Sequence, residues 1–448
     1  MKQFLITLFF TLFTILSFSQ YIEGKVIDAT SNKPIEGVNV YMNAINRGAV
    51  TNEKGVYYLK FPFKIIKDGA IRFSHIAYKE LEVPYFPDKK DYSVNLLVDL
   101  NKLEEINISN QRNLNKTIPY KELSSMKKAL HSFGSVLKDG KIYVAGGDAS
   151  YNENHFKKLM EYDPDRAFQK FLNGTARNYK KESYSGDLQT YDIKSDTWYL
   201  TKSKFEKRAY HALNEYNNKL FAVGGKTIST NGKYEYLDAK IEVFDLAKDM
   251  LLIDNTNPHQ AVNFAAFTYN NKMILMGGSL KLKRNGFKEY TNKVHLYDFI
   301  TGNWYQLGNM PIAKEVSGVL INDKIYLIGG FNRNPLASIE TFDLKTQKWE
   351  KEGDLFYGIS KPAITHKNNV IYIFDNGKIS TYNIDSKELT EYLIDLILEN
   401  SELFYADNTL YILGGYRENS YSLYPSKGLF SIKINEFDKT KIHYSKTL

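Results

Sequence analysis

The sequence predicts an all-β protein in which a small antiparallel β-sandwich precedes a six-bladed β-propeller. Three observations lead to this fold class. Short runs of alternating apolar and polar residues, separated by turns, fill residues 20–110. Beyond residue 126, apolar strands that end in a glycine pair recur about every 50 residues, which is the period of a propeller blade. An aromatic–acid step follows most glycine pairs, and all three tryptophans of the chain stand seven residues past such an aromatic.

The composition of the chain limits its class and its chemistry. With 448 residues the chain is too long for one compact core, so at least two folded units are expected. Hydrophobic residues make up 43% and charged residues 25%, as in ordinary soluble globular proteins. The net charge of +8 is modest and its basic residues are interspersed with acidic ones, so no nucleic-acid partner is expected. The absence of cysteine excludes disulfides, thiolate metal sites and cysteine nucleophiles.

The first nineteen residues are expected to be a signal peptide cleaved after Ser19. Lys2 precedes the apolar run FLITLFFTLFTILSF (4–18), which is too short to cross a bilayer comfortably. Ser17 and Ser19 are the small residues expected before a cleavage site. Without cysteine the chain lacks the acceptor for a bacterial lipid anchor. We therefore expect an exported protein of the periplasm or the cell exterior that is not a lipoprotein. The alternative is an uncleaved anchor.

Residues 20–110 are expected to form the sandwich. Alternating patterns predict strands in YIEGKVIDATSNKPIEGVNVYMN (21–43), TNEKGVYYLKFP (51–62), IRFSHIAYKELEVPY (71–85) and DYSVNLLVDL (91–100). This region resembles the carboxypeptidase regulatory-like domain, and the matching residues are Gly24, Val26, Asp28, Pro34, Ile35, Gly37, Val38, Val40, Thr51, Asn52 and Gly55. The resemblance implies an accessory β-domain without peptidase chemistry. The histidine at position 75 has no ligand-spaced partner and is interpreted as structural. The predicted division of the chain is a signal peptide (1–19), a sandwich (20–110), a linker (111–125) and a propeller (126–448).

The repeat of the second region is marked by its glycine pairs. The pairs begin at Gly146, Gly224, Gly277, Gly329 and Gly414, and Asp375-Asn376 is an eroded copy. The aromatic–acid steps are Tyr191-Asp192, Phe244-Asp245, Tyr297-Asp298, Phe342-Asp343 and Tyr382-Asn383, and the residues seven positions past each aromatic are Trp198, Leu251, Trp304, Trp349 and Leu389. This pattern resembles kelch repeats, which implies one four-stranded antiparallel sheet per copy and hence six blades. Neighbouring blades must cover the faces of each sheet, while the glycines allow close backbone approach or a positive φ. The sixth copy has Ile432-Lys433 in place of the aromatic–acid step, so the sequence does not predict how the ring closes.

Enzymatic activity is not the favoured interpretation. The kelch family includes galactose oxidase, whose cofactor needs a cysteine-crosslinked tyrosine, and this chain has no cysteine. The chain also resembles the periplasmic N-acetylneuraminate epimerases, which implies acid–base chemistry beside a carboxylate-binding arginine. Arg208 and His211 are the candidates for such a catalytic pair, on a strand expected to line the central channel. We favour a structural role for both, and for His131 on the equivalent strand of the first blade. No phosphate loop or histidine metal motif is present, so no cofactor or metal is expected.

Long connections are the favoured binding surface. Between the glycine pair and the aromatic–acid step, blades one to three insert residues 148–186, 226–240 and 279–293. These connections join the same two strands in each blade, so they should emerge on one face. Their candidate ligand-binding residues are Tyr151, His155, Tyr234, Tyr236, Lys283, Arg284, Phe287 and Tyr290. We expect a monomeric, non-enzymatic binding protein that recognises a glycan or protein partner and does not span a membrane. One alternative is that the protein is a sugar-handling enzyme of the epimerase type. Another is that the long connections bind nothing and merely vary in length.

Overall fold

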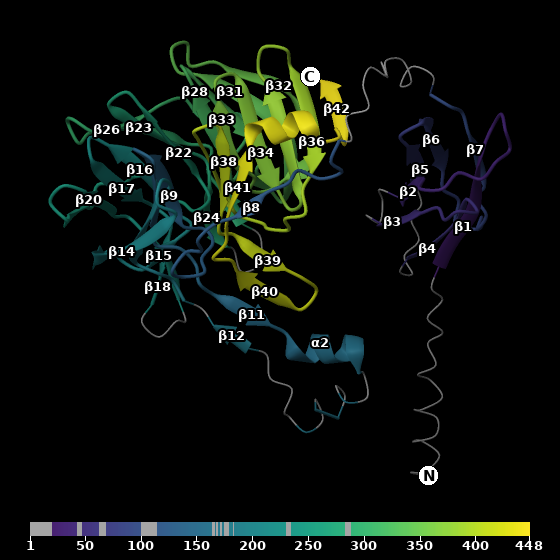
Figure 1. The fold of residues 1–448 in the computed structure, drawn as a ribbon, viewed down its shortest axis with the longest axis horizontal. Coiled ribbons are helices and arrows are strands. Elements are labelled where there is room, and N and C mark those ends of the chain that lie inside the picture. Colours follow the sequence, from purple (N-terminus) through teal and green to yellow (C-terminus); the bar gives the residue numbers. More distant parts are fainter. Residues whose placement is uncertain are drawn as a thin grey trace, which may run out of the picture. The chain divides into compact units, whose positions relative to one another are not determined.

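A computed structural model describes residues 20–42, 47–61, 69–99, 114–163, 166, 169–170, 173, 179–181, 183–229, 234–282 and 288–448. The expected signal peptide (1–19) lies outside these described residues. The chain divides into two compact units, residues 1–111 and residues 112–448. Strands make up nearly all of the regular structure of both units (Figure 1), which confirms the all-β fold class. No helix in the described part of the chain is long and apolar enough to cross a bilayer.

The first unit is a small β-sandwich, as the sequence predicts. Its sheets have the orders β4-β1-β7 and β3-β2-β5-β6. The strands are β1 (Gln20–Asp28), β2 (Asn39–Met42), β3 (Arg47–Val50), β4 (Val56–Phe61), β5 (Ala70–His75), β6 (Tyr78–Pro84) and β7 (Val94–Leu96). Ile22, Val26 and Phe73 are fully buried in its core. The expected antiparallel pairing fails at one place, because β1 pairs with β7 in parallel. Gly24 permits this approach, since a Cβ there would lie 2.7 Å from the backbone of Tyr92.

The second unit is a β-propeller built from four-stranded sheets. We number the sheets that carry the repeat as blades one to six in chain order, and those of blades four and five have a fifth strand. The number of blades in the ring stays a prediction. From the central strand outward, the strands of blade one are β9 (Gly134–Lys138), β10 (Lys141–Ala145), β13 (Asp187–Asp192) and β14 (Thr197–Lys204). Those of blade two are β16 (Ala212–Tyr216), β17 (Lys219–Val223), β20 (Ile241–Asp245) and β21 (Met250–Asp254). Those of blade three are β22 (Ala265–Tyr269), β23 (Lys272–Met276), β26 (Val294–Asp298) and β27 (Trp304–Gln306). Blade four contains β28 (Gly318–Ile321), β29 (Lys324–Ile328), β31 (Asn334–Asp343) and β32 (Trp349–Ile359). Blade five contains β33 (Ala363–Lys367), β34 (Val370–Asp375), β35 (Lys378–Asn383) and β36 (Glu388–Leu393). Blade six contains β37 (Glu402–Ala406), β38 (Thr409–Leu413), β41 (Leu429–Lys433) and β8 (Lys121–Glu122).

The central strands follow one another around the middle of the propeller. Strand β9 contacts β16, and the contacts continue through β22, β28 and β33 to β37. Blades six and one share a hydrophobic core that includes Tyr191, Trp198, Phe404 and Tyr411. The repeated sheets therefore pack side by side, and each covers the apolar faces of its neighbours.

The outer strand of blade six comes from the other end of the propeller sequence. Strand β8 pairs antiparallel with β41, and Ile118 just before it is buried in the core of blades five and six. The expectation of a linker over 111–125 is therefore wrong for the part that contains β8. Strand β8 is only two residues long, so the sequence shows no alternation of apolar and polar residues that would predict it. After the short 3₁₀ helix Ile434–Lys439, β42 (Tyr444–Thr447) adds a fifth strand beside β36.

The seven-residue spacing of the landmarks is the register of one hairpin. Tyr191 lies directly across from Trp198 in the pairing of β13 with β14, and Phe342 lies across from Trp349 in blade four. The rings of the second pair are stacked with their centroids 4.6 Å apart. The acid that follows each aromatic closes the turn, since Asp343 Oδ1 accepts hydrogen bonds from the backbone N–H groups of Lys345 and Thr346.

The glycine pairs join each blade to the next. The Gly147 N–H donates to the Arg208 carbonyl at 2.8 Å, and the Gly278 N–H donates to the Lys314 carbonyl at 2.8 Å. Gly147 has a φ of 108°, which an ordinary side chain rarely adopts. In the eroded copy the Asn376 N–H makes the same bond to Leu398 at 3.0 Å with a φ of 37°. Asparagine tolerates this region, so blade five keeps the contact without glycine.

Candidate functional site

The long connections lie together on one face of the propeller. Those of blades one to three contain β11 (Tyr151–Glu153), α2 (His155–Tyr162) and β12 (Tyr179–Lys181); β18 (Lys226–Ile228) and β19 (Glu235–Leu237); and β24 (Ser279–Leu282) and β25 (Lys288–Tyr290). Blade six adds the hairpin of β39 (Tyr416–Glu418) and β40 (Ser422–Pro425), and the short connection of blade four contains only β30 (Phe331–Asn332). Neighbouring connections contact one another. Strand β11 of blade one pairs with β40 of blade six (Figure 1). The Tyr290 hydroxyl accepts a hydrogen bond from the Arg333 N–H at 3.2 Å, which joins blades three and four.

The residues predicted to bind a ligand are spread over this face. Tyr234 and Tyr236 are 60% and 57% exposed on the connection of blade two. Tyr151 stacks on Tyr424, with ring centroids 6.3 Å apart, and His155 is the first residue of α2. Tyr290 packs toward Phe331. The other three candidates, Lys283, Arg284 and Phe287, lie outside the described residues.

A pocket of about 540 Å³ separates the connections of blades two and three. Its apolar lining includes Leu237 and Leu280, and Tyr236 stands at its edge. Two ion pairs border it, because Lys226 Nζ lies 2.8 Å from Glu235 Oε1 and Lys288 Nζ lies 2.7 Å from Glu315 Oε1. Tyr210 and Asn263 line both this pocket and the central cavity, so the two spaces adjoin.

The mouth of the central cavity is held by backbone hydrogen bonds between blades. The Tyr210 N–H donates to the Ser132 carbonyl at 2.7 Å, and the Val316 N–H donates to the Asn263 carbonyl at 3.1 Å. Tyr210 has a φ of 61°, an unusual conformation for a bulky side chain. Its hydroxyl donates to Asp148 Oδ2 at 2.9 Å, which fixes the ring across blades one and two. At the corresponding position of blade five stands Lys361, before a proline.

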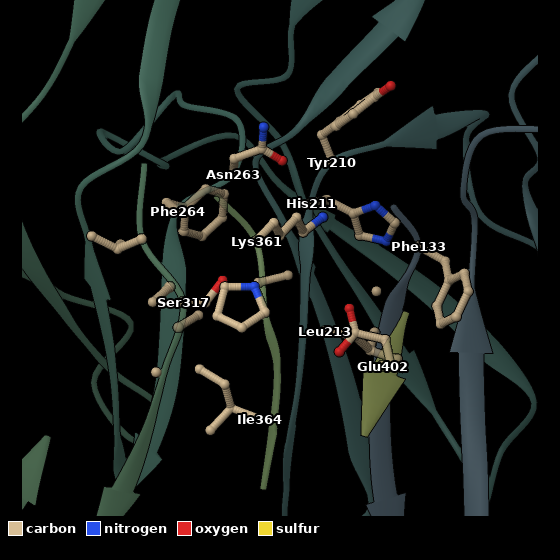
Figure 2. A pocket seen from close by; sticks show the side chains of 18 of the residues that line it. Phe133, Tyr210, His211, Leu213, Asn263, Phe264, Ser317, Lys361, Ile364 and Glu402 are labelled. Atoms are coloured by element: carbon tan, nitrogen blue, oxygen red, sulfur yellow. The ribbon is translucent and has the colours of Figure 1, made fainter. Parts of the chain in front are cut away.

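The central cavity holds about 170 Å³ and is lined by the starts of the central strands of every blade. Figure 2 shows His211, Lys361 and Glu402 around it, from blades two, five and six. Burial raises the pKa of the Glu402 carboxyl to about 7, although the Lys361 charge opposes this shift. Burial also lowers the pKa of the Lys361 amine, against the pull of Glu402 and Glu315.

His211 lies in this cavity as a neutral imidazole. Burial and the charges of Arg208 and Lys361 hold the pKa of its ring well below the ordinary value. Neither of its ring nitrogens has a hydrogen-bond partner among the described residues. The ring is wedged between blades, since a Cβ on Gly134 would lie 2.6 Å from His211 Nε2.

Arg208 does not line the cavity, although the sequence places it beside His211. Its side chain is 0% exposed, with Nη2 2.8 Å from Asp238 Oδ2 and 2.6 Å from Glu242 Oε2. Glu242 lies two residues before the aromatic of the aromatic–acid step, on the third strand of its blade. Residues at the same position in other blades also contact the segment that enters the blade. Gln189 Oε1 accepts from the Lys128 N–H at 3.2 Å, and Glu340 Oε2 lies 3.0 Å from Lys314 Nζ. The geometry therefore gives Arg208 a structural contact.

The histidines at 75 and 131 also make internal contacts. His75 Nδ1 accepts a hydrogen bond from the Ala77 N–H at 3.2 Å within the sandwich. His131 Nε2 lies 3.9 Å from Asp148 Oδ2, and burial lowers the pKa of its ring to about 4. No group of three or more histidine, aspartate or glutamate residues in the described ranges is arranged to hold a metal ion.

Sequence reasoning missed Lys361 and Glu402. A signal for Glu402 is nevertheless present, because the other five central strands begin with Gly134, Ala212, Ala265, Gly318 and Ala363. Small residues leave a narrow channel open, and the glutamate is the exception at this position. Lys361 has no comparable signal, since the positions that match it carry side chains of several kinds.

Comparisons with known proteins agree with this architecture. Residues 170–377 match the KLHDC2/KLHL20/DRC7 Kelch-repeats domain, and residues 22–117 match the CarboxypepD_reg-like domain. Human Kelch-like protein 15 is 29% identical over 252 residues, which cover 47% of this chain and 41% of that protein. Kelch-like protein 40 of Xenopus tropicalis is 23% identical over 288 residues, which cover 60% of this chain and 45% of that protein. The chain thus spans less than half the length of these relatives.

A solved structure titled "Structure of YjhT" has a similar fold. Its TM-score is 0.50 at 13% identity, and the match covers 68% of this chain and 96% of that chain. Together the comparisons confirm both resemblances seen in the sequence. The chain carries kelch repeats after a carboxypeptidase regulatory-like domain.

Proposed function

We propose that this chain, with its kelch-repeat propeller behind a carboxypeptidase regulatory-like domain, is an exported, non-enzymatic binding protein. A kelch-repeat propeller suggests a protein-interaction role. The observation that carries the proposal is the exposed ring of Tyr236, which lines the pocket of about 540 Å³, together with the exposed Tyr234 on the same connection. Loops on a rigid scaffold are where binding residues concentrate. The apolar run at residues 4–18, which is expected to belong to a signal peptide, supports export.

The chemistry of this face suits a protein surface first and a glycan second. Tyrosine rings contribute large contact areas at low cost in side-chain entropy, and they suit apolar side chains or sugar rings. The two ion pairs at the pocket, Lys226–Glu235 and Lys288–Glu315, present both signs of charge to a polar partner. The apolar floor at Leu237 and Leu280 favours a protein side chain as the group that enters.

The epimerase-type alternative needs an arginine free to bind a carboxylate beside an acid–base group. Arg208 is already paired with Asp238 and Glu242 inside blade two. Its burial supports the non-enzymatic proposal, because freeing the guanidinium would leave two buried carboxylates without a partner.

The test compares variants that change one exposed tyrosine surface at a time. Secreted proteins of the source organism and a glycan array are probed with the full chain, with Y234A/Y236A, and with the control Y199A. Tyr199 is 57% exposed on β14, away from the long connections, so it matches Tyr236 in type and exposure. We expect Y234A/Y236A to lose about tenfold or more in affinity for the captured partner, while Y199A keeps it. Equal affinity of both variants would refute the proposed surface, and capture of glycans alone would replace the protein partner by the glycan.

A further inference from the structure

We infer that Lys361 is a reactive amine that forms an imine with small aldehydes or ketones entering the central cavity. This activity is separate from partner binding at the long connections. It rests on the position of one lysine, on the groups that face it, and on the size of the space around it.

Lys361 is an unpaired lysine at the centre of the propeller. Among the described residues that line the central cavity it is the single lysine, Glu402 the single acid and His211 the single histidine. The Lys361 amine makes no hydrogen bond or ion pair with the described part of the chain, and it lies 6.0 Å from the centroid of the Tyr210 ring. Most other described lysines near the mouth are engaged, as Lys226 is with Glu235. The amine is therefore free to react.

The groups around Lys361 keep part of it uncharged. Burial favours the neutral amine, and the positive charge of Lys288 adds to this, while Glu402 and Glu315 act in the opposite direction. The balance lowers the pKa of the amine, and a neutral amine is the nucleophile that imine formation requires. His211, which faces the same cavity, stays neutral.

Glu402 supplies the acid that the dehydration step needs. With a pKa of about 7 its carboxyl is partly protonated at neutral pH, which suits a group that both gives and takes a proton. The neutral amine attacks the carbonyl carbon, a C–N bond forms, and the carbonyl electron pair moves to oxygen. Proton transfer from nitrogen to this oxygen gives the carbinolamine. The Glu402 carboxyl protonates the hydroxyl, the C–O bond breaks, water leaves, and the carboxylate takes the remaining proton from nitrogen.

The cavity restricts which carbonyl compounds can react. Its volume of about 170 Å³ and its lining of small residues such as Gly134 and Ala265 admit only short molecules. The polar groups at Ser317 and Glu402 suit hydroxyl-bearing ones. The expected ligand class is thus a small aldehyde or ketone, including short open-chain sugars.

The test uses propanal with cyanoborohydride, which reduces an imine to a stable secondary amine. The full chain is labelled briefly at pH 7 and the modified lysines are mapped by peptide mass spectrometry. We expect Lys361 to be labelled faster than Lys367, because burial lowers the pKa of the Lys361 amine and so leaves more of it in the neutral, nucleophilic form. Lys367 is a suitable reference, since it is a partly exposed lysine of the same blade whose Nζ donates to Asn408 Oδ1 at 2.7 Å. K361R should remove this adduct, and K367R should leave it unchanged.

Glu402→Gln separates an acid role from a purely electrostatic one. Removing the negative charge would lower the pKa of Lys361 further and speed labelling if Glu402 acted through its charge alone. If Glu402 acts as the acid, as we infer, E402Q should label Lys361 about a hundredfold more slowly than the wild type does, which is within the usual range for general acid catalysis. Circular dichroism and tryptophan fluorescence confirm that each variant is folded. Labelling of Lys361 no faster than of Lys367 in the folded wild-type protein would overturn the inference, and faster labelling of E402Q would overturn the role of Glu402.

Discussion

Replacing Arg208 by methionine should destabilise the propeller without touching the binding face. The arginine is fully buried, and its Nη2 contacts Asp238 at 2.8 Å and Glu242 at 2.6 Å. Methionine fills a similar volume but leaves both carboxylates unpaired in the interior. Breaking a buried ion pair on one side costs about 3–5 kcal/mol, so we expect R208M to lose that much in the free energy of unfolding.

The assay is urea unfolding followed by tryptophan fluorescence. All three tryptophans, Trp198, Trp304 and Trp349, lie in propeller strands, so the signal reports this unit alone. The loss should depend on pH. Burial already raises the pKa of Glu242, and losing the arginine raises it further. A carboxyl whose pKa is raised in the folded state destabilises that state as pH rises through the interval, so R208M should recover stability as pH falls.

A second variant tests whether the two unpaired carboxylates cause the loss of stability. R208M/E242Q/D238N removes the stranded charges and should recover most of the loss, because a neutral, filled site replaces the ion pairs. A loss below about 1 kcal/mol in R208M would refute the structural role. A loss of partner binding or activity at unchanged stability would return Arg208 to the functional site.

Three further predictions concern processing, ring closure and pH. Intact-mass analysis of the exported protein should show a chain that begins at Gln20, and a retained Met1 would exclude cleavage. The six-blade count stays a prediction. A chain starting at Ser125 lacks β8 and should expose the edge of β41, so it should unfold at a lower urea concentration than a chain starting at Arg112. Equal unfolding midpoints of the two chains would show that β8 does not close the ring. Because burial raises the pKa of Glu402 from 4.5 to about 7, the wild type should lose about 1–2 kcal/mol of stability between pH 5 and pH 8, an amount discounted for solvent screening, while E402Q should not. Parallel pH profiles of the two proteins would contradict the shift.

The blades could be predicted because their determinants are local. The pairs Tyr191–Trp198 and Phe342–Trp349 face each other across a single hairpin, so a fixed seven-residue spacing appears in the sequence. The glycine pairs are likewise visible. A β-carbon on the first glycine would collide with the next blade, and one on the second would collide with the segment that enters its own blade. Repetition turns such weak local signals into a strong one.

Long-range contacts could not be predicted from the same patterns. Strand β8 pairs with β41 across most of the chain through only two residues, which carry no period of their own. Arg208 and His211 are close in sequence, yet Tyr210 between them has a φ of 61°, and the chain turns there. The acids that capture Arg208 come some 30 residues later, and a spacing of that kind has no sequence signature. Lys361 and Glu402 line one cavity only because the central strands of all blades begin around it.

The long connections are the surface that we propose to bind the partner. Replacing residues 279–293 by a connection of the length that blade four uses tests it most directly, with affinity for the captured partner measured alongside the urea midpoint. We expect the variant to fold, because β23 and β26 keep their pairing, and to lose binding. Its midpoint should fall, because the buried Glu315 carboxylate loses its ion pair with Lys288. Unchanged affinity, in this variant and in the matching one at 226–240, would contradict the claim and place the site at the central cavity near His211.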